Sequence, residues 1–380
     1  MTSSENLPER FENLVPVEAV ALQIARTDLH YVTACYLGLD ASASAAELAL
    51  IQYGLMASYE AQVHFKKTLG IELHADWPAD VAKAARMSGK FFDDSKRNFE
   101  GVVDHFEELT AANRGAFFPV DRRGRIFDFL RDDLSVTYRN NVPYTANISA
   151  FFLTGLAPAD TSTIGDVGPK VRQLAIGLGN IAAQLLLDSG QPVHGTPPVT
   201  GLEVFDAKSR KALPRLFAAQ HPPALSVALL TIQGMLASAR ASSSRATCSW
   251  CEQAAAKHRF VALFQTLKAL SIMRSTESSR SSPRQLNLIL DEPESQWILD
   301  NAKLRNGLIH LGLQDIALRL DHASTIDEVI LAYSGESAEA VNARVARHLE
   351  TVFQMLTSWA TAAPSSKRSF RDALHPAPAN

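Results

Sequence analysis

The chain has few cysteines and few aromatic residues. Its 380 residues include 3 cysteines and 4 tryptophans, and aromatic side chains make up 8% of the total. So small and odd a number of cysteines excludes the disulfide framework that holds small secreted domains together. Wholesale disorder is excluded as well, because 46% of the residues are hydrophobic and only 20% are charged. We therefore expect a globular protein of two or three domains.

Long apolar segments and targeting signals are also missing. Residues 1–15 are polar and acidic, and they contain neither the basic region nor the apolar stretch of a secretory signal. The longest apolar runs, 174–187 and 224–239, are shorter than the roughly 20 residues of a bilayer-spanning helix, and both contain glutamine. We expect them to be buried core helices. The sequence predicts a cytoplasmic protein with no membrane partner.

Several common catalytic motifs do not occur. The sequence has no Gx4GK[ST], HExxH or GxSxG, and no Glu-x-x-His of the kind that builds di-iron bundles. A GxGxxA match at 177–182 is followed by turn residues rather than by a second strand and an acidic residue, so we interpret it as close helix packing. These absences remove the commonest routes to nucleotide binding, zinc proteolysis and serine hydrolysis.

One CxxC pair is present, formed by Cys248 and Cys251, with His258 seven residues later. A structural zinc site needs four ligands, and a second Cys/His pair at suitable spacing is missing. Redox CxxC pairs usually lie where a strand meets a helix, and no strand is predicted here. We interpret the cysteines as two helix residues without shared chemistry, and we expect no metal ion and no cofactor.

The charge of the chain is unevenly distributed. Residues 1–207 carry 17 basic and 26 acidic side chains, whereas residues 208–380 carry 20 and 14, so the formal net charge of −3 divides into −9 and +6. A Gly/Pro-rich stretch at 189–201 lies close to this boundary and is a candidate linker. We predict an acidic regulatory or sensing domain at 1–190, a basic domain at 201–363 and a disordered tail at 364–380. A polyanionic partner would prefer the basic part.

Apolar residues recur at helical spacing through nearly all of the chain, which predicts an all-α protein with two helical bundle regions. The short run 329–333 is the only β-like segment that we identify. Pro143 should break or kink the helix that contains it. Helices are predicted over 42–67, 91–109, 126–152, 171–187, 224–239, 248–273, 294–311 and 338–360.

One motif in the basic part carries a coherent chemistry, the sequence Arg305-Asn306-x3-His310. Asn306 and His310 are four residues apart, so they share a helix face and the amide can orient the imidazole. A histidine can take a proton from a ribose 2′-OH or give one to a leaving oxygen. A guanidinium such as that of Arg305 can hold the phosphate and stabilise the charge that builds on it. Together these groups suffice for cleavage of RNA without a metal.

This RNxxxH motif on a predicted helix resembles the HEPN superfamily (higher eukaryotes and prokaryotes nucleotide-binding). The resemblance covers the motif and a possible up-and-down bundle over 215–363. It implies a homodimer in which two motifs form one composite site, and a metal-independent ribonuclease of a toxin–antitoxin or antiviral defence system. The resemblance implies that Arg305 binds and polarises the phosphate, that His310 is the acid and base, and that Asn306 supports them. Family members often add a polar or acidic residue from an earlier helix, for which Glu252 is a candidate.

Other interpretations remain open. Some HEPN domains do not catalyse, and in this alternative the bundle binds RNA, a nucleotide or a partner protein such as an antitoxin. In a purely structural alternative, Arg305 pairs with a surface aspartate and His310 is an ordinary helix residue. Residues 138–144 contain an Arg-Asn pair followed by a tyrosine at the position that the histidine holds in RNxxxH. This match is either a degenerate repeat or a coincidence. No constellation supports an enzyme of small-molecule metabolism.

Overall fold

The architecture was obtained as a computed structural model. It describes residues 11, 13–38, 48–75, 77, 99–117, 132–154, 167–187, 189–217, 223–274 and 283–360. The predicted tail at 364–380 lies outside these residues. The main helices and strands, in chain order, are α1 (Pro16–Leu37), α2 (Leu48–Leu69), α4 (Phe99–Phe117), β1 (Leu134–Arg139), β2 (Val142–Ala146), α5 (Asn147–Thr154), α6 (Val167–Leu186), β3 (Leu202–Ala207), α7 (Ser209–Ala212), α8 (Pro223–Ser242), α9 (Ser249–Arg274), α10 (Pro283–Leu290), α11 (Pro293–Asp300), α12 (Ala302–His310), α13 (Ile326–Ser334) and α14 (Ala338–Trp359).

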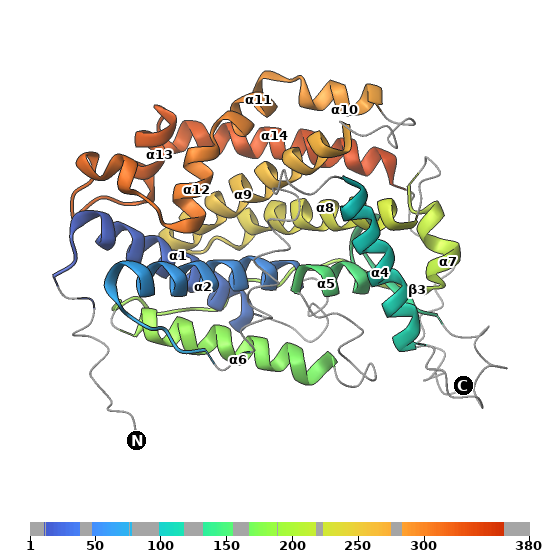
Figure 1. Ribbon diagram of the computed structural model, residues 1–380, viewed down its shortest axis with the longest axis horizontal. Helices are drawn as coiled ribbons and strands as arrows, with labels where there is room; N and C mark the ends of the chain where they lie inside the picture. Colours follow the sequence, from blue (N-terminus) through green and yellow to red (C-terminus); the bar gives the residue numbers. More distant parts are fainter. Residues whose placement is uncertain are drawn as a thin grey trace.

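Helices α1, α2, α6, α8, α9 and α14 run along the long axis of the molecule, with α8 and α9 in the middle, whereas α4 runs across it (Figure 1). Helix α8 packs against α9, α4 and α14, and α9 also contacts α1. The all-α class is therefore confirmed. Helix α8 is long and apolar enough to cross a membrane by composition, but 94% of its apolar window is buried inside the protein. It is placed as a core helix, as the sequence predicts.

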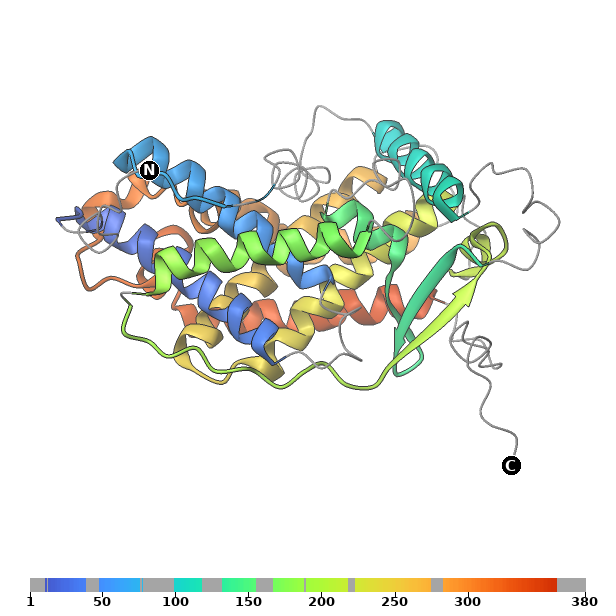
Figure 2. The same ribbon diagram turned by 90° about the horizontal axis from the view of Figure 1, so that it is seen from below.

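A small antiparallel sheet at one end of the molecule was not predicted (Figure 2). Its order is β2-β1-β3. The predicted helix over 126–152 is wrong in its central part, because β1 and β2 form a hairpin there. Asn140 and Asn141 both have positive φ, 52° and 65°, which matches the primed two-residue turn that asparagine tolerates. The segment 138–144, whose Arg-Asn pair has the spacing of the RNxxxH motif, thus lies in a hairpin and not on a helix.

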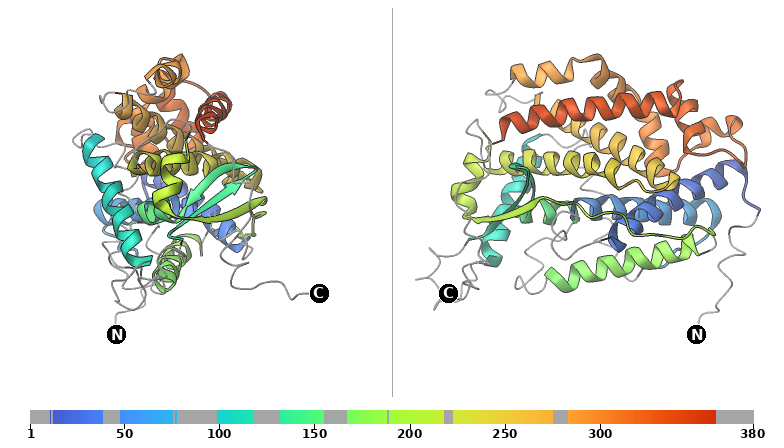
Figure 3. Two further views of the ribbon diagram at one scale, coloured as in Figure 1. Left: turned by 90° about the vertical axis from the view of Figure 1, so that its right-hand side faces the viewer. Right: turned by 180° about the vertical axis from the view of Figure 1, so that it is seen from behind.

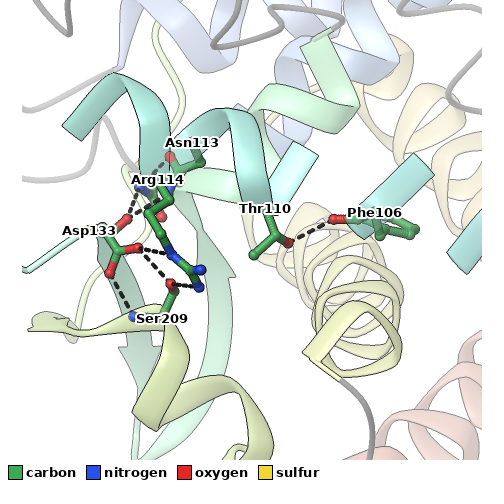
Figure 4. A network of polar contacts seen from close by, with 7 residues as sticks. Phe106, Thr110, Asn113, Arg114, Asp133 and Ser209 are labelled. Carbon is green, nitrogen blue, oxygen red and sulfur yellow. Dashed lines mark hydrogen bonds and ion pairs between the residues drawn. The ribbon is translucent and has the colours of Figure 1, made fainter. Parts of the chain in front are cut away.

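Polar contacts attach this sheet to the neighbouring helices (Figure 4). Asp133, just before β1, accepts hydrogen bonds from the backbone nitrogen of Ser209 at 2.7 Å and from its hydroxyl at 2.5 Å. Asp133 therefore caps the start of α7. Its own carbonyl accepts a hydrogen bond from Asn113 of α4 at 2.7 Å, and the Arg114 guanidinium lies 3.9 Å from its carboxylate. One aspartate thus joins α4, β1 and α7.

Within the described residues, helices are confirmed in six of the remaining predicted segments, where α2, α4, α6, α8, α9 and α14 lie. Residues 42–47 and 91–98 of two predicted helices lie outside the described residues. Two further segments differ from the prediction. The segment 294–311 is two helices, because α11 ends at Asp300 and α12 begins after Asn301. The run 329–333 belongs to α13 and not to a strand; Thr325 starts this helix with a capping box and Gly335 ends it. Helix α1 was not singled out in the sequence.

The candidate linker 189–201 runs as an extended segment along the helices (Figure 3). The Thr196 backbone nitrogen donates to the Ala34 carbonyl at 2.9 Å, at the end of α1. A Cβ on Gly38 would lie 1.7 Å from the Thr196 carbonyl oxygen, so only glycine permits this approach. The two predicted domains remain a prediction, but helices from both ranges bury their apolar residues in one common core.

A buried ion pair joins the two halves of the chain inside this core. Asp28 of α1 and Lys257 of α9 form a salt bridge whose side chains are 3% and 2% exposed. The Tyr53 hydroxyl of α2 donates to the same carboxylate at 2.8 Å. Burial raises the pKa of Asp28, and Lys257 and Tyr53 act in the opposite direction. Each charge depends on its partner, because an unpaired buried charge is very costly.

Replacing Lys257 alone should therefore be strongly destabilising. We expect Lys257→Met to lower the free energy of unfolding by about 3–5 kcal/mol, because Asp28 is left buried and unpaired. The double variant Asp28→Asn/Lys257→Met removes both charges and keeps an oxygen for Tyr53, so it should lose less than the single variant. Urea denaturation measures both. A double variant less stable than Lys257→Met would contradict this account.

Stability should also depend on pH through His258. This side chain is 5% exposed and packs on the Tyr53 ring at 4.4 Å between centroids. Burial, with the charges of Arg259 and Arg245, lowers the pKa of His258 to about 3 from 6.5. Between these values the unfolded chain binds a proton that the folded chain does not, so stability falls as the pH falls below 6.5 and is constant below about 3.

We expect His258→Phe, which keeps a ring against Tyr53, to reduce this dependence. The stability difference between pH 7 and pH 5 should shrink by up to about 2 kcal/mol relative to the unmodified protein. Urea denaturation at the two pH values is the measurement. Other buried histidines affect the pH dependence of stability equally in both proteins. If the difference in stability between pH 7 and pH 5 is the same in His258→Phe as in the unmodified protein, then His258 is protonated in the folded state.

Candidate functional site

The RNxxxH motif lies on α12, a short helix that packs on α2, α9 and α13. The helix ends at His310, because Leu311 adopts a left-handed conformation with φ of 57°. Gly307 allows the close packing on α13, since a Cβ there would lie 2.7 Å from the Tyr333 ring. The motif's histidine therefore occupies the last helical position, where its side chain can reach neighbouring elements.

The structure brings the three predicted residues together within one chain. An Arg305 Nη1 proton is donated to Asn306 Oδ1 at 3.0 Å, and the same nitrogen lies 3.4 Å from His310 Nε2. The Arg305 guanidinium also lies over the Phe264 ring of α9, 5.6 Å from its centroid. Arg305 is 5% exposed. Asn306 thus holds the arginine, whereas the sequence predicted that it would orient the histidine.

The group that orients His310 is Glu60 of α2. His310 Nδ1 lies 2.9 Å from Glu60 Oε2, and the two side chains are 27% and 4% exposed. This contact has the length of a hydrogen bond but not its alignment, and it becomes an ion pair when the ring is protonated. A buried carboxylate beside Nδ1 favours a proton on that nitrogen and leaves Nε2 as the acceptor. Sequence reasoning missed Glu60, because nothing local links positions 60 and 310.

A second residue of α2 contacts the end of α12. His64, one turn after Glu60, forms a hydrogen bond with the backbone of His310. Burial lowers the pKa of His64, while Glu18 and this backbone contact raise it. The i, i+4 spacing puts Glu60 and His64 on one face of α2, toward α12. Helix α2 therefore positions both the side chain and the backbone of His310.

The predicted acidic partner, Glu252, is not part of this cluster. It is exposed in the first turn of α9, twelve residues before Phe264. At 1.5 Å per residue this places it about 18 Å along the helix from the ring that Arg305 covers. The acidic group of the site thus comes from the acidic half of the chain and not from the basic half.

The exposed groups of α12 follow one face of the helix. Lys303, Asn306 and His310 have the spacing i, i+3 and i+7, and none of the three is buried. The Lys303 side chain is 81% exposed. This face presents a cation, an amide and an oriented imidazole to solvent, with the Arg305 guanidinium directly beneath.

A second histidine cluster has a different character. Ser295 Oγ lies 2.6 Å from His348 Nε2, and His348 Nδ1 lies 3.4 Å from Glu292. The order resembles a Ser-His-Glu triad. However, Ser295 is 0% exposed and His348 is 3% exposed, so a substrate cannot reach the hydroxyl. We interpret this cluster as a set of structural polar contacts that hold α11 against α14.

Comparisons with known proteins leave the family open. The sequence matches no protein-family model, and neither a curated protein nor a solved structure shows significant similarity to the chain.

Proposed function

We propose that the protein is a metal-independent endoribonuclease of HEPN type. The observation that carries this proposal is the cluster of Glu60, Arg305 and His310, in which a buried carboxylate and a guanidinium contact opposite nitrogens of one imidazole. An imidazole held in this way is suited to proton transfer, and an adjacent arginine is suited to a phosphate. The exposed face of Lys303, Asn306 and His310 supports access by an RNA backbone.

The proposed reaction is a transfer of the phosphoryl group within RNA. The ribose 2′-oxygen forms a bond to phosphorus, the bond to the 5′-oxygen breaks, and a 2′,3′-cyclic phosphate and a 5′-hydroxyl result. His310 Nε2 takes the 2′-OH proton, and a protonated His310 of a second copy gives a proton to the 5′-oxygen. The Arg305 guanidinium stabilises the negative charge on the phosphoryl oxygens. Because the Arg305–His310 contact of 3.4 Å is long, an entering phosphate can draw the guanidinium away and free Nε2.

This proposal includes a homodimer, since a single imidazole cannot be base and acid in the same step. A cytoplasmic toxin or antiviral ribonuclease fits the motif, and a regulatory partner such as an antitoxin would keep it inactive. The position of Glu60 supports a role for the acidic half, because that half supplies the group that orients His310.

The burial of Arg305 favours a second candidate, a non-catalytic module that binds RNA, a nucleotide or a partner protein. In this alternative the guanidinium, 5% exposed and fixed over Phe264, stabilises the end of α12 and does not touch a phosphate. Binding that is unchanged in His310→Ala, without any cleavage, would support it.

The motif residues can be tested by direct substitution. Purified protein should cleave RNA in the presence of EDTA, and His310→Ala and Arg305→Ala should each lower the rate by about 10²–10⁴-fold. Cleavage is followed on a labelled RNA by gel electrophoresis. His74→Ala, which changes an exposed histidine at the end of the α2 region, is the matched control and should keep full activity. Activity that survives both motif substitutions would refute the proposal.

Glu60 acts in this proposal as a positioning residue for His310. Glu60→Gln keeps the shape of the side chain but removes the charge beside His310 Nδ1. Because Glu60 is buried and does not reach the RNA, kcat should fall by about 10²–10⁴-fold while KM stays unchanged. Glu72→Gln changes an exposed glutamate shortly after α2 and should leave both constants unaltered. A rise in KM of the same size, with kcat unchanged, would instead assign Glu60 to RNA binding.

A further inference from the structure

The CxxC pair acquires a third partner from a distant part of the chain. His30 of α1 lies beside Cys248 and Cys251 at the start of α9, 218 residues away from Cys248 in sequence. The distance between Cys248 Sγ and His30 Nε2 is 3.7 Å, and that between the two sulfurs is 2.7 Å. All three potential ligand atoms lie within 4.8 Å of one another.

These distances are close to those of a tetrahedral zinc site. Bond lengths of about 2.3 Å to sulfur and 2.0 Å to nitrogen put ligand atoms about 3.5–3.8 Å apart around the ion. The sulfur–nitrogen distance already has this value. The sulfurs are about 1 Å closer together than in such a site, and rotation of the partly exposed Cys248 side chain can open this gap. A tetrahedral set of thiolate and imidazole ligands is typical of structural zinc sites.

The surroundings point to a ligand. His30 is 4% exposed, and its Nε2 is the ring nitrogen that faces Cys248 Sγ. Its ring packs edge-on against Trp250, with 5.4 Å between centroids, which fixes its orientation. Cys251 is 1% exposed. Two sulfur atoms and an imidazole are thus gathered in an otherwise apolar cluster, where unpaired polar groups are costly.

The extended segment 189–201 brings a fourth candidate, His194. The neighbouring Thr196 backbone is bonded to Ala34, one helical turn after His30, and its hydroxyl accepts from Arg245 at 3.3 Å. Val193 and Cys248 pack against the same apolar cluster that contains Cys251. His194 lies two residues before Thr196 on this segment and is exposed.

We propose that His30, Cys248 and Cys251 bind one zinc ion and that His194 closes its coordination. The closed site has the Cys2His2 composition of structural zinc centres. It connects α1, the start of α9 and the extended segment, and so stabilises the fold. Cys251 precedes Phe264 by 13 residues, which is about 20 Å along α9. The site takes no part in the proposed cleavage of RNA, so each of the two proposals can be refuted without the other.

The test uses the full-length protein, purified with a reducing agent and without added chelator. We expect about one zinc ion per chain by elemental analysis. Replacement by Co²⁺ should give thiolate charge-transfer absorption and the visible bands of a tetrahedral ion. Cys248→Ser/Cys251→Ser and His30→Ala should lower the zinc content at least tenfold, and His194→Ala should weaken zinc affinity by about 10–100-fold. Circular dichroism establishes that each variant is folded.

Cys35→Ala is the matched control, because Cys35 is a buried cysteine in the same apolar cluster but is not a proposed ligand. It should keep the full zinc content. Metal content that is equal in the Cys248/Cys251 variant and the control would refute the site. So would a Cys248–Cys251 disulfide that persists in the presence of the reducing agent, seen as a mass lower by two hydrogen atoms. Unchanged affinity in His194→Ala would refute the closed coordination.

Discussion

The buried pair of Asp28 and Lys257 is the constraint on which the rest of the structure depends. A carboxylate and an ammonium in an apolar core are tolerated only when they meet, so α1 and α9 have one acceptable register. Tyr53 brings α2 into the same contact. Glu60 follows Tyr53 by seven residues and Phe264 follows Lys257 by seven, which is two helical turns on the same face. The contact that aligns the helices therefore also places the carboxylate under His310 and the ring under Arg305.

The same alignment governs the other end of α9. His30 is two residues after Asp28 on α1, and Cys251 is six residues before Lys257 on α9. The ion pair thus lies between the cluster of cysteines and histidine and the RNxxxH cluster. Each of these clusters combines residues from both halves of the chain. The acidic half supplies Glu60 and His30, so both clusters depend on the packing of the two halves against each other.

The sequence predicted the class of the fold and most of the helices, since helical periodicity is a local property. It missed the hairpin because the apolar residues of β1 and β2 fit a helix as well, and the turn signal of Asn140 and Asn141 was interpreted as part of a motif. Arg305, Asn306 and His310 were identifiable because they lie within six residues. Glu60 and His30 were not, because their partners are more than 200 positions away. Only tertiary packing, which no single sequence reveals, brings them together.

The separation between Glu60 and His310 also affects how the protein is made. Residues 60 and 310 leave the ribosome roughly 13–50 seconds apart at synthesis rates of about 5–20 residues per second. During that interval α1 and α2 lack α9 and α12, so the apolar faces and the Asp28 carboxylate have no native partner. The oriented histidine forms only after α12 has emerged and docked. The nascent chain therefore carries an incomplete cluster of Glu60, Arg305 and His310 until nearly all of its helices are synthesised.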